Sequence, residues 1–385
     1  MARQASERIG WIDAARGLGI VLVLLGHVEG GLIDAGVQSQ SSWSWPGYAI
    51  YTFHMPLFFV LAGLNVPRSL DRGPRHFLRT KLQTIAFPYV LWSLIQGAAL
   101  VAASSFTNGQ THLRDLLSIG WHPLGQFWFL YVLMICQLAA LVIGPLRTVS
   151  AGLAIISLGA GALLAQGGLI EALLHSFPFF VAGILLSRRL ASELDNDKSS
   201  SSLRAKRSNP GATSTLDAPG LLRQRARNDE VGNRSRSVGL GRAAHGTPGR
   251  YLIYAAAAFI GLVSAALLSG PLDGMNSDSP LALPAAICGI AFIVSLARAL
   301  GGSMLSAASS LGRMSMTIYV MHVLAAAGTR ILLLKLHVPP NPALYVVACT
   351  TVGIAAPMIA HRVLGSLGLL ASFGLANRTS KGVHV

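Results

Sequence analysis

Long apolar segments recur along the whole chain, and they constrain its fold more than any other feature. Each is about 20 residues long, the length of α-helix that crosses the ~30 Å hydrocarbon core of a bilayer. Hydrophobic residues make up 52% of the 385 residues and charged residues only 12%, about half the charged share of a soluble domain. The sequence therefore predicts an all-α, polytopic membrane protein.

We expect about ten membrane-spanning helices in one bundle, with both termini in the cytoplasm. Basic residues are concentrated in alternate segments between the apolar runs, as is typical of loops that face the cytoplasm. This bias accounts for the net charge of +15, so we expect the lipid bilayer and no nucleic acid as a partner. The predicted spans are residues 12–31, 47–66, 82–106, 124–144, 149–166, 169–187, 251–270, 281–299, 314–335 and 343–363.

The composition changes between the sixth and seventh predicted spans. Residues 190–249 are rich in Ser, Arg, Asn and Gly and hold almost no aromatic residues. Such a segment buries too little apolar surface to offset its ordering entropy, so we expect a disordered cytoplasmic insertion. Its strings resemble translated mobile palindromic repeats of bacterial DNA, and a basic loop that binds anionic lipid headgroups is the alternative. Residues 1–189 and 250–365 then form one domain of six plus four helices, and residues 366–385 form a cytoplasmic tail.

The first span carries two ionisable residues, Arg16 and His27, eleven positions apart. At about 1.5 Å of helical rise per residue, the histidine lies ~16 Å beyond the arginine. An arginine at the cytoplasmic interface therefore places His27 near the middle of the bilayer. An ionisable side chain at that depth is costly and by default marks a functional site. A histidine that is hydrogen-bonded within the bundle for packing alone is the alternative.

Two further histidines lie in apolar spans. His54 comes just before Pro56, which removes a backbone donor and is expected to kink the second span. A structural and a functional role for His54 are equally compatible with its position. His322 lies about two turns into the ninth span, with Arg313 at the cytoplasmic entrance. We expect His322 to line the same cavity as His27.

A basic segment follows the second span. Its four arginines are spaced by four, three and four residues, so a helix would place them on one face. Such a cluster is typical of any cytoplasmic loop, but guanidinium groups also match the phosphate oxygens of an acyl carrier. The four arginines are Arg68, Arg72, Arg75 and Arg79, and Lys81 follows them.

Four phrases of the sequence together resemble one family of membrane enzymes. They are Arg16 and His27 with ten residues between them, the string FHMPLFFVLAG at 53–63, Trp128-Phe129-Leu130, and the string LGRMSMTIYVMH at 311–322. In this order they resemble the acyltransferase-3 family of membrane O-acyltransferases, and the second phrase is most similar to the fucose 4-O-acetylase branch. The resemblance extends over about residues 8–365, apart from the insertion.

The resemblance implies transfer of an acetyl or other short acyl group from cytoplasmic acyl-CoA to a hydroxyl. The acceptor is expected to be a carbohydrate of the cell envelope or a secreted glycan, and the location the bacterial inner membrane. Arg16 and His27 occupy the Arg-x10-His positions of the family, and Arg75 and Arg79 best match its arginine pair after the second span. No metal is expected, because the three cysteines lack the spacing of metal ligands.

The chemistry of these residues fits acyl transfer. A neutral imidazole can take the proton of a sugar hydroxyl while that oxygen attacks a thioester. His27 is therefore the predicted base or, alternatively, a transient acyl carrier. Arg16 either holds the acyl donor at the mouth of the site or polarises the thioester carbonyl. The remaining candidates are His54 and His322 at the catalytic centre and Arg72, Arg75, Arg79 and Arg313 for binding acetyl-CoA.

A transporter or flippase of a glycan or small molecule is the alternative function. Intramembrane histidine and arginine also form translocation paths. However, the sequence lacks a pair of interrupted spans at corresponding positions in two halves, which is typical of many transporters. A purely structural or sensory role would leave the intramembrane histidines without a purpose.

Overall fold

A computed structural model describes residues 10–102, 116–143, 152–157, 160, 168–187, 248–272, 274 and 276–376. These residues form helices joined by short connections, and no strand occurs among them. Nine of the described helices are long and apolar enough to cross a membrane. They correspond to nine of the ten predicted spans. Most of the remaining span, 149–166, lies outside the described residues, as do the predicted insertion up to residue 247 and the end of the tail.

The helices follow one another in a simple order along the chain. Those before the predicted insertion are α1 (Gly10–Asp34), α2 (Gln40–Gly63), α3 (Val66–Leu70), α4 (Pro74–Lys81), the π-helical turn η1 (Leu82–Ala86), α5 (Phe87–Ala102), the short 3-10 turns η3 (Ser118–Gly120) and η4 (Gly125–Phe127), α7 (Trp128–Ile143) and a helix at Leu169–Ser187. Those after it are α11 (Pro248–Ser269), the 3-10 turn η5 (Pro280–Ala282), α12 (Leu283–Ala299), α13 (Gly302–Arg313), α14 (Ser315–Lys335) and α15 (Pro342–Ser366).

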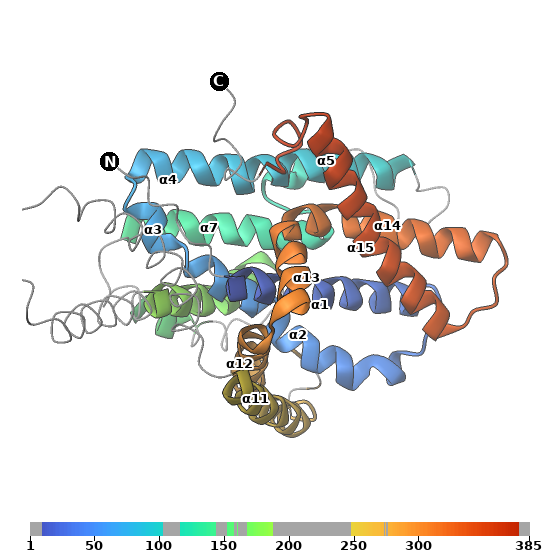
Figure 1. Cartoon of the computed structure of the whole chain (residues 1–385), viewed down its shortest axis with the longest axis horizontal. Coiled ribbons are helices and arrows are strands. Elements are labelled where there is room, and N and C mark those ends of the chain that lie inside the picture. Colours follow the sequence, from blue (N-terminus) through green and yellow to red (C-terminus); the bar gives the residue numbers. More distant parts are fainter. Residues whose placement is uncertain are drawn as a thin grey trace, which may run out of the picture.

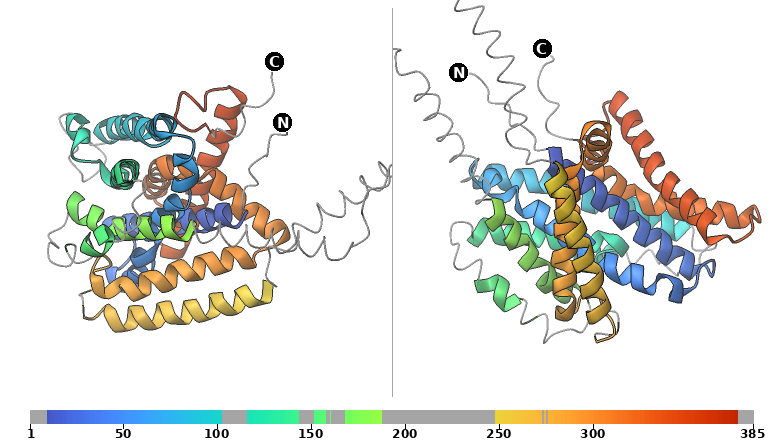
Figure 2. Two further views of the ribbon diagram at one scale, coloured as in Figure 1. Left: turned by 90° about the vertical axis from the view of Figure 1, so that its left-hand side faces the viewer. Right: turned by 60° about the horizontal axis from the view of Figure 1, so that its bottom comes forward.

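Helix α1 is the central element of the bundle. It contacts α2, α12, α13, α14 and α15 (Figure 1). Its sequence suits this position because small residues on several sides allow neighbouring helices to approach closely. Helices α11 and α12 form a hairpin that crosses α1 and α2 steeply, as the views in Figure 2 show. Other helices therefore surround the side chains of α1 along most of its length.

The short stretch between the predicted spans 281–299 and 314–335 forms helix α13, which packs against the start of α1. Two glycines allow the two backbones to touch. A Cβ on Gly17 would lie 2.0 Å from a backbone oxygen of α13, and a Cβ on Gly312 would lie 1.8 Å from a backbone oxygen of α1. These glycines directly adjoin Arg16 and Arg313 in the chain. The close crossing therefore holds the two arginines at the same end of the bundle.

The basic segment after α2 does not form the single helix face that the spacing of its arginines suggested. Gly73 separates α3 from α4 with a backbone φ of +93°, a left-handed conformation that only glycine adopts readily. Pro74 then opens α4, as proline commonly does at a first helical position. Helix α4 continues through η1 into α5, so the third span begins at Pro74 rather than at residue 82.

The segment that leads into α7 packs inside the bundle. Phe127 and Leu130 are fully buried inside the bundle. The reason is a polar anchor next to them, where the side-chain amides of Gln126 and Gln96 exchange two hydrogen bonds of 3.0 and 2.7 Å. Satisfying both amides in this way allows the segment to be buried without an unpaired polar group.

Candidate active site

A cavity of about 360 Å³ opens at the end of the bundle where α1 begins and α2 ends. Three cations line it, namely Arg16 of α1, Lys81 of α4 and Arg313 at the end of α13. None of the described residues that line it is acidic. Asp13 lies beside it and places a carboxylate oxygen 3.5 Å from the Arg16 guanidinium, so the two residues form an ion pair. We call this space the basic cavity, and its end of the molecule the basic end.

The arginines that the sequence proposed for donor binding lie at the same end but on its surface. Arg72, Arg75 and Arg79 are exposed, and none is among the described residues that line the cavity. Lys81 takes the place expected for them, because it lies two residues beyond Arg79, nearer to the apolar part of the same helix. Only Arg313 of the four predicted donor-binding residues lines the basic cavity.

A second cavity, of about 860 Å³, occupies the other side of the bundle centre. His27 of α1 and His54 of α2 line its inner part, and Trp121 and Trp128 also contribute to its wall. We call it the histidine cavity. Helix α2 passes through Pro56 without interruption, and His54 is buried, with only 3% of its surface exposed. The structure thus brings two of the predicted histidines to one space.

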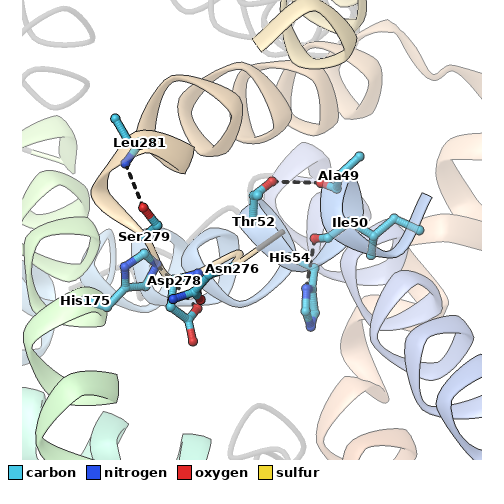
Figure 3. Close-up of polar contacts among 9 residues, drawn as sticks. All are labelled: Ala49, Ile50, Thr52, His54, His175, Asn276, Asp278, Ser279 and Leu281. Atoms are coloured by element: carbon cyan, nitrogen blue, oxygen red, sulfur yellow. Dashed lines mark hydrogen bonds and ion pairs between the residues drawn. The ribbon is translucent and has the colours of Figure 1, made fainter. Parts of the chain in front are cut away.

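The mouth of the histidine cavity carries a polar pair that the sequence did not single out for function. His175 Nε2 lies 4.0 Å from a carboxylate oxygen of Asp278. Figure 3 shows this pair on one side of the opening, with the His54 imidazole pointing away from α2 on the other side. Desolvation raises the pKa of the Asp278 carboxyl, while the neighbouring imidazole opposes that rise. The two residues come from segments 103 positions apart (278 less 175), so their pairing depends on the fold.

The hydrogen bonds of the three histidines fix which ring nitrogen is free. His27 Nδ1 lies 2.9 Å from the carbonyl oxygen of Val23, and His54 Nδ1 lies 2.9 Å from that of Ile50. A carbonyl oxygen only accepts, so each Nδ1 must carry the proton and donate it. The same holds for His322, whose Nδ1 contacts the carbonyl oxygens one turn before it. Each neutral imidazole therefore keeps a lone pair on Nε2, as a general base requires.

His322 lies behind His27 and is not among the described residues that line either cavity. It is fully buried, its ring meets that of His27 edge to face at a centroid distance of 4.9 Å, and its Nε2 has no hydrogen-bond partner. The expectation that it shares the cavity of His27 is therefore wrong. The helical register explains this, because the face of α14 that carries His322 packs directly against α1.

The basic cavity and the histidine cavity meet at three residues that line both, Val23, Met55 and Tyr319. Tyr319 is held in place by its hydroxyl, which donates to the carbonyl oxygen of Gln126. Met55 is unbranched and flexible, so it can adjust its shape to a group that passes it. Arg16 and His27 thus line two adjacent cavities that have these three residues in common.

Sequence reasoning missed Tyr319 as a cavity residue, and it counted Lys81 among the five cations of the basic segment that suit phosphates without singling it out. Tyr319 stands three positions before His322 within the motif at 311–322, so its place in the motif was the available signal. For Lys81 the signal was weaker, since only its position beside a long apolar stretch distinguished it from the cations before it.

Comparison with known proteins identifies the family. The model of the acyltransferase domain Acyl_transf_3 matches residues 9–362. Nodulation protein NolL of Sinorhizobium fredii is 26% identical over 191 residues, 48% of this chain and 50% of that protein. NolL of Mesorhizobium japonicum is 26% identical over 183 residues, 46% of this chain and 47% of that protein. The aligned stretch therefore spans about half the length of these relatives, and no solved structure matches significantly. Because the family model covers nearly the whole chain, this protein belongs to the acyltransferase-3 family of membrane acyltransferases.

Proposed function

We propose that the protein transfers an acetyl or other short acyl group from acyl-CoA to a hydroxyl of a carbohydrate acceptor. The junction of the two cavities at Val23, Met55 and Tyr319 carries this proposal. It allows a charged donor to enter from the basic end and a polar acceptor from the other. Their reacting groups then meet inside the bundle, and neither molecule has to cross the bilayer.

The basic cavity suits the donor. Coenzyme A carries phosphates, and the three cations Arg16, Lys81 and Arg313 face the cavity without an acidic side chain in its described lining. Arg16 lies eleven residues, or ~16 Å of helix, from His27. At that distance it does not polarise a thioester carbonyl beside His27, so its role is to hold the carrier at the mouth. An extended pantetheine arm is long enough to carry the acyl group past Met55.

The exposed arginines of α4 and the segment before it have a less direct role in this proposal. Arg72, Arg75 and Arg79 lie at the basic end, outside the cavity lining. A cluster of like charge at the mouth of a cavity attracts an oppositely charged ligand and raises its local concentration. We therefore propose that these arginines attract the phosphates of acyl-CoA and that Lys81 contacts the bound carrier.

The histidine cavity suits a carbohydrate. Trp121 lines it and is 64% exposed, and a large exposed ring at the edge of a cavity offers an apolar platform with a polar handle. The faces of a sugar ring carry C–H groups that stack on such a platform. Polar groups around it, among them His175 and Asp278, are available to bind the sugar hydroxyls. The acceptor hydroxyl then lies next to His27 Nε2.

The unprotonated Nε2 of His27 acts as the base in the transfer step. His27 Nε2 takes the proton of the acceptor hydroxyl while its oxygen attacks the thioester carbonyl carbon. The tetrahedral intermediate collapses, the carbon–sulfur bond breaks, and the thiolate of CoA leaves. It recovers the proton from His27, so the products are an acyl ester and free CoA. A positioned base contributes about 10²- to 10⁴-fold to such a step.

Reconstitution in liposomes tests the proposal. The purified protein is supplied with radiolabelled acetyl-CoA on one side and with a sugar on the other, and both the acetylated sugar and the movement of unmodified sugar are measured. We expect the acetyl ester to accumulate and no unmodified sugar to cross. Movement of the sugar without esterification would contradict the proposal and favour a transporter. In the cell we place the protein in the bacterial inner membrane, with the basic end toward cytoplasmic acyl-CoA.

A further inference from the structure

A third cavity, of about 300 Å³, reaches His27 from a different direction. It lies between the second half of α1 and the helices α14 and α15. It shares two lining residues with the histidine cavity, His27 and Tyr51. Arg330 of α14 also lines it, and we call it the Arg330 cavity. His27 therefore belongs to the walls of both cavities, and a molecule that places a hydroxyl at His27 lies close to each of them.

The guanidinium of Arg330 packs against helix α1 at Gly31. A Cβ on Gly31 would lie 1.8 Å from Arg330 Nη1, so any larger residue there would displace the arginine. Gly31 follows His27 by four residues, which is one helical turn or ~6 Å along the axis. The absence of a side chain at this position thus allows a positive charge to lie against α1 one helical turn beyond His27 in the chain.

This charge has no internal counterion in the part of the chain that the structure describes. Arg330 is half-buried within a membrane-spanning helix and makes no ion pair or hydrogen bond there. Asp34 lines the same cavity but is exposed at its rim, and Glu29 accepts a 2.6 Å hydrogen bond from Gln38. A cation inside a membrane span is costly and is normally paired. The geometry therefore suits an anion that a ligand supplies.

We propose that Arg330 binds an anionic group of the acceptor, a carboxylate or a phosphate, while a hydroxyl of the same sugar lies at His27. This inference rests on the proposed function. The helical turn between His27 and Gly31, where Arg330 packs, is similar in length to one pyranose ring, so the anion belongs to the acylated sugar or is attached directly to it. The acceptor class is then an acidic sugar or a sugar phosphate. Guanidinium groups bind both kinds of oxyanion through paired hydrogen bonds.

The test compares three small acceptors with the purified protein in lipid nanodiscs. Methyl glucuronide carries a carboxylate, glucose 1-phosphate carries a phosphate, and methyl glucoside is neutral. We expect kcat/KM for at least one charged sugar to exceed that for the glucoside by about 10-fold or more, as hydrogen bonds between charged groups provide. Which charged sugar shows the preference distinguishes a carboxylate from a phosphate.

Arg330→Gln should reduce the charged-to-neutral ratio of kcat/KM to about one, and Arg330→Lys should retain part of it. This ratio does not depend on the fraction of protein that folds. Lys335→Gln is the matched control, because it removes a positive charge from the same helix outside the described lining of the cavity, and it should leave the ratio unchanged. Equal use of neutral and charged sugars by the unaltered protein, or an unchanged ratio in Arg330→Gln, would overturn this inference alone. Failure to acylate any of the three sugars would instead overturn the proposed function.

Discussion

The imidazoles of His27 and His322 meet edge to face in the bundle, with ring centroids 4.9 Å apart and planes at 86°. His322 Nε2 is buried without a hydrogen-bond partner, and leaving such an atom unpaired costs about 1–3 kcal/mol of stability. His322→Phe keeps a ring beside His27 and removes this atom. We therefore expect an equal or higher Tm together with a kcat about 10-fold lower, because His27 loses a polar neighbour.

The Tm and the kcat of His322→Phe together distinguish a positioning role of His322 from a packing role. A KM for acyl-CoA close to that of the unaltered protein is expected, because His322 lies away from the basic cavity. A lower Tm with unchanged kcat would contradict the account and leave His322 as a packing residue.

The contact of α1 with α13 is expected to control donor binding. A Cβ on Gly312 would lie 1.8 Å from a backbone oxygen of α1, so Gly312→Ala must push the helices apart and move Arg313 away from Arg16. We expect a Tm several degrees lower and a KM for acyl-CoA raised about 10-fold, since a displaced cation no longer reaches the phosphates. Thermal unfolding and initial-rate kinetics measure the two effects.

Gly328→Ala in α14 is the control for this substitution, because a Cβ there would meet nothing within 4 Å. Alanine at an open helical position stabilises by roughly 0.5–1 kcal/mol, so its Tm should be equal or slightly higher. If Gly312→Ala behaves in the same way as this control, the close crossing does not position the arginines.

Donor binding should depend more on Lys81 than on the arginines that precede it in the chain. Lys81 lines the basic cavity, whereas Arg75 and Arg79 are exposed outside its described lining. Lys81→Gln should raise the KM for acyl-CoA about 10-fold at unchanged kcat, as expected when one charge-assisted hydrogen bond is lost. Arg75→Ala combined with Arg79→Ala should raise it less, and this smaller effect should disappear at high salt. A larger effect of the double substitution would place the phosphates on the surface instead.

Stacking of the acceptor sugar on Trp121 can be tested separately. Trp121→Ala removes the exposed ring from the histidine cavity, and stacking on a ring of this kind contributes about 0.5–1.5 kcal/mol. We expect a several-fold higher KM for the sugar and no change in the KM for acyl-CoA. Trp45→Ala is the control, because Trp45 is also exposed but is not among the described residues that line the cavity. Equal effects of the two substitutions would argue against stacking at Trp121.

The membrane helices and the intramembrane position of His27 followed from the sequence because they depend on local properties. Segment length and apolar content specify the helices, and the rise per residue specifies the depth of His27. The packing of His322 behind His27 depends on which faces of α1 and α14 meet, which a single sequence does not encode locally. The course of the basic segment depended on one backbone angle, at Gly73. For Arg330 the decisive feature was the missing side chain of Gly31, which acts only once two distant helices pack together.

The central claim is that the free nitrogen of His27 activates the acceptor. The most direct measurement is the kcat for esterification of a sugar by His27→Gln in nanodiscs, at saturating acyl-CoA and with the donor KM measured in parallel. We expect kcat to fall at least about 100-fold while the KM for acyl-CoA stays within about 3-fold, because Arg16, Lys81 and Arg313 remain in place. A variant that forms the ester at nearly the original rate would contradict this claim.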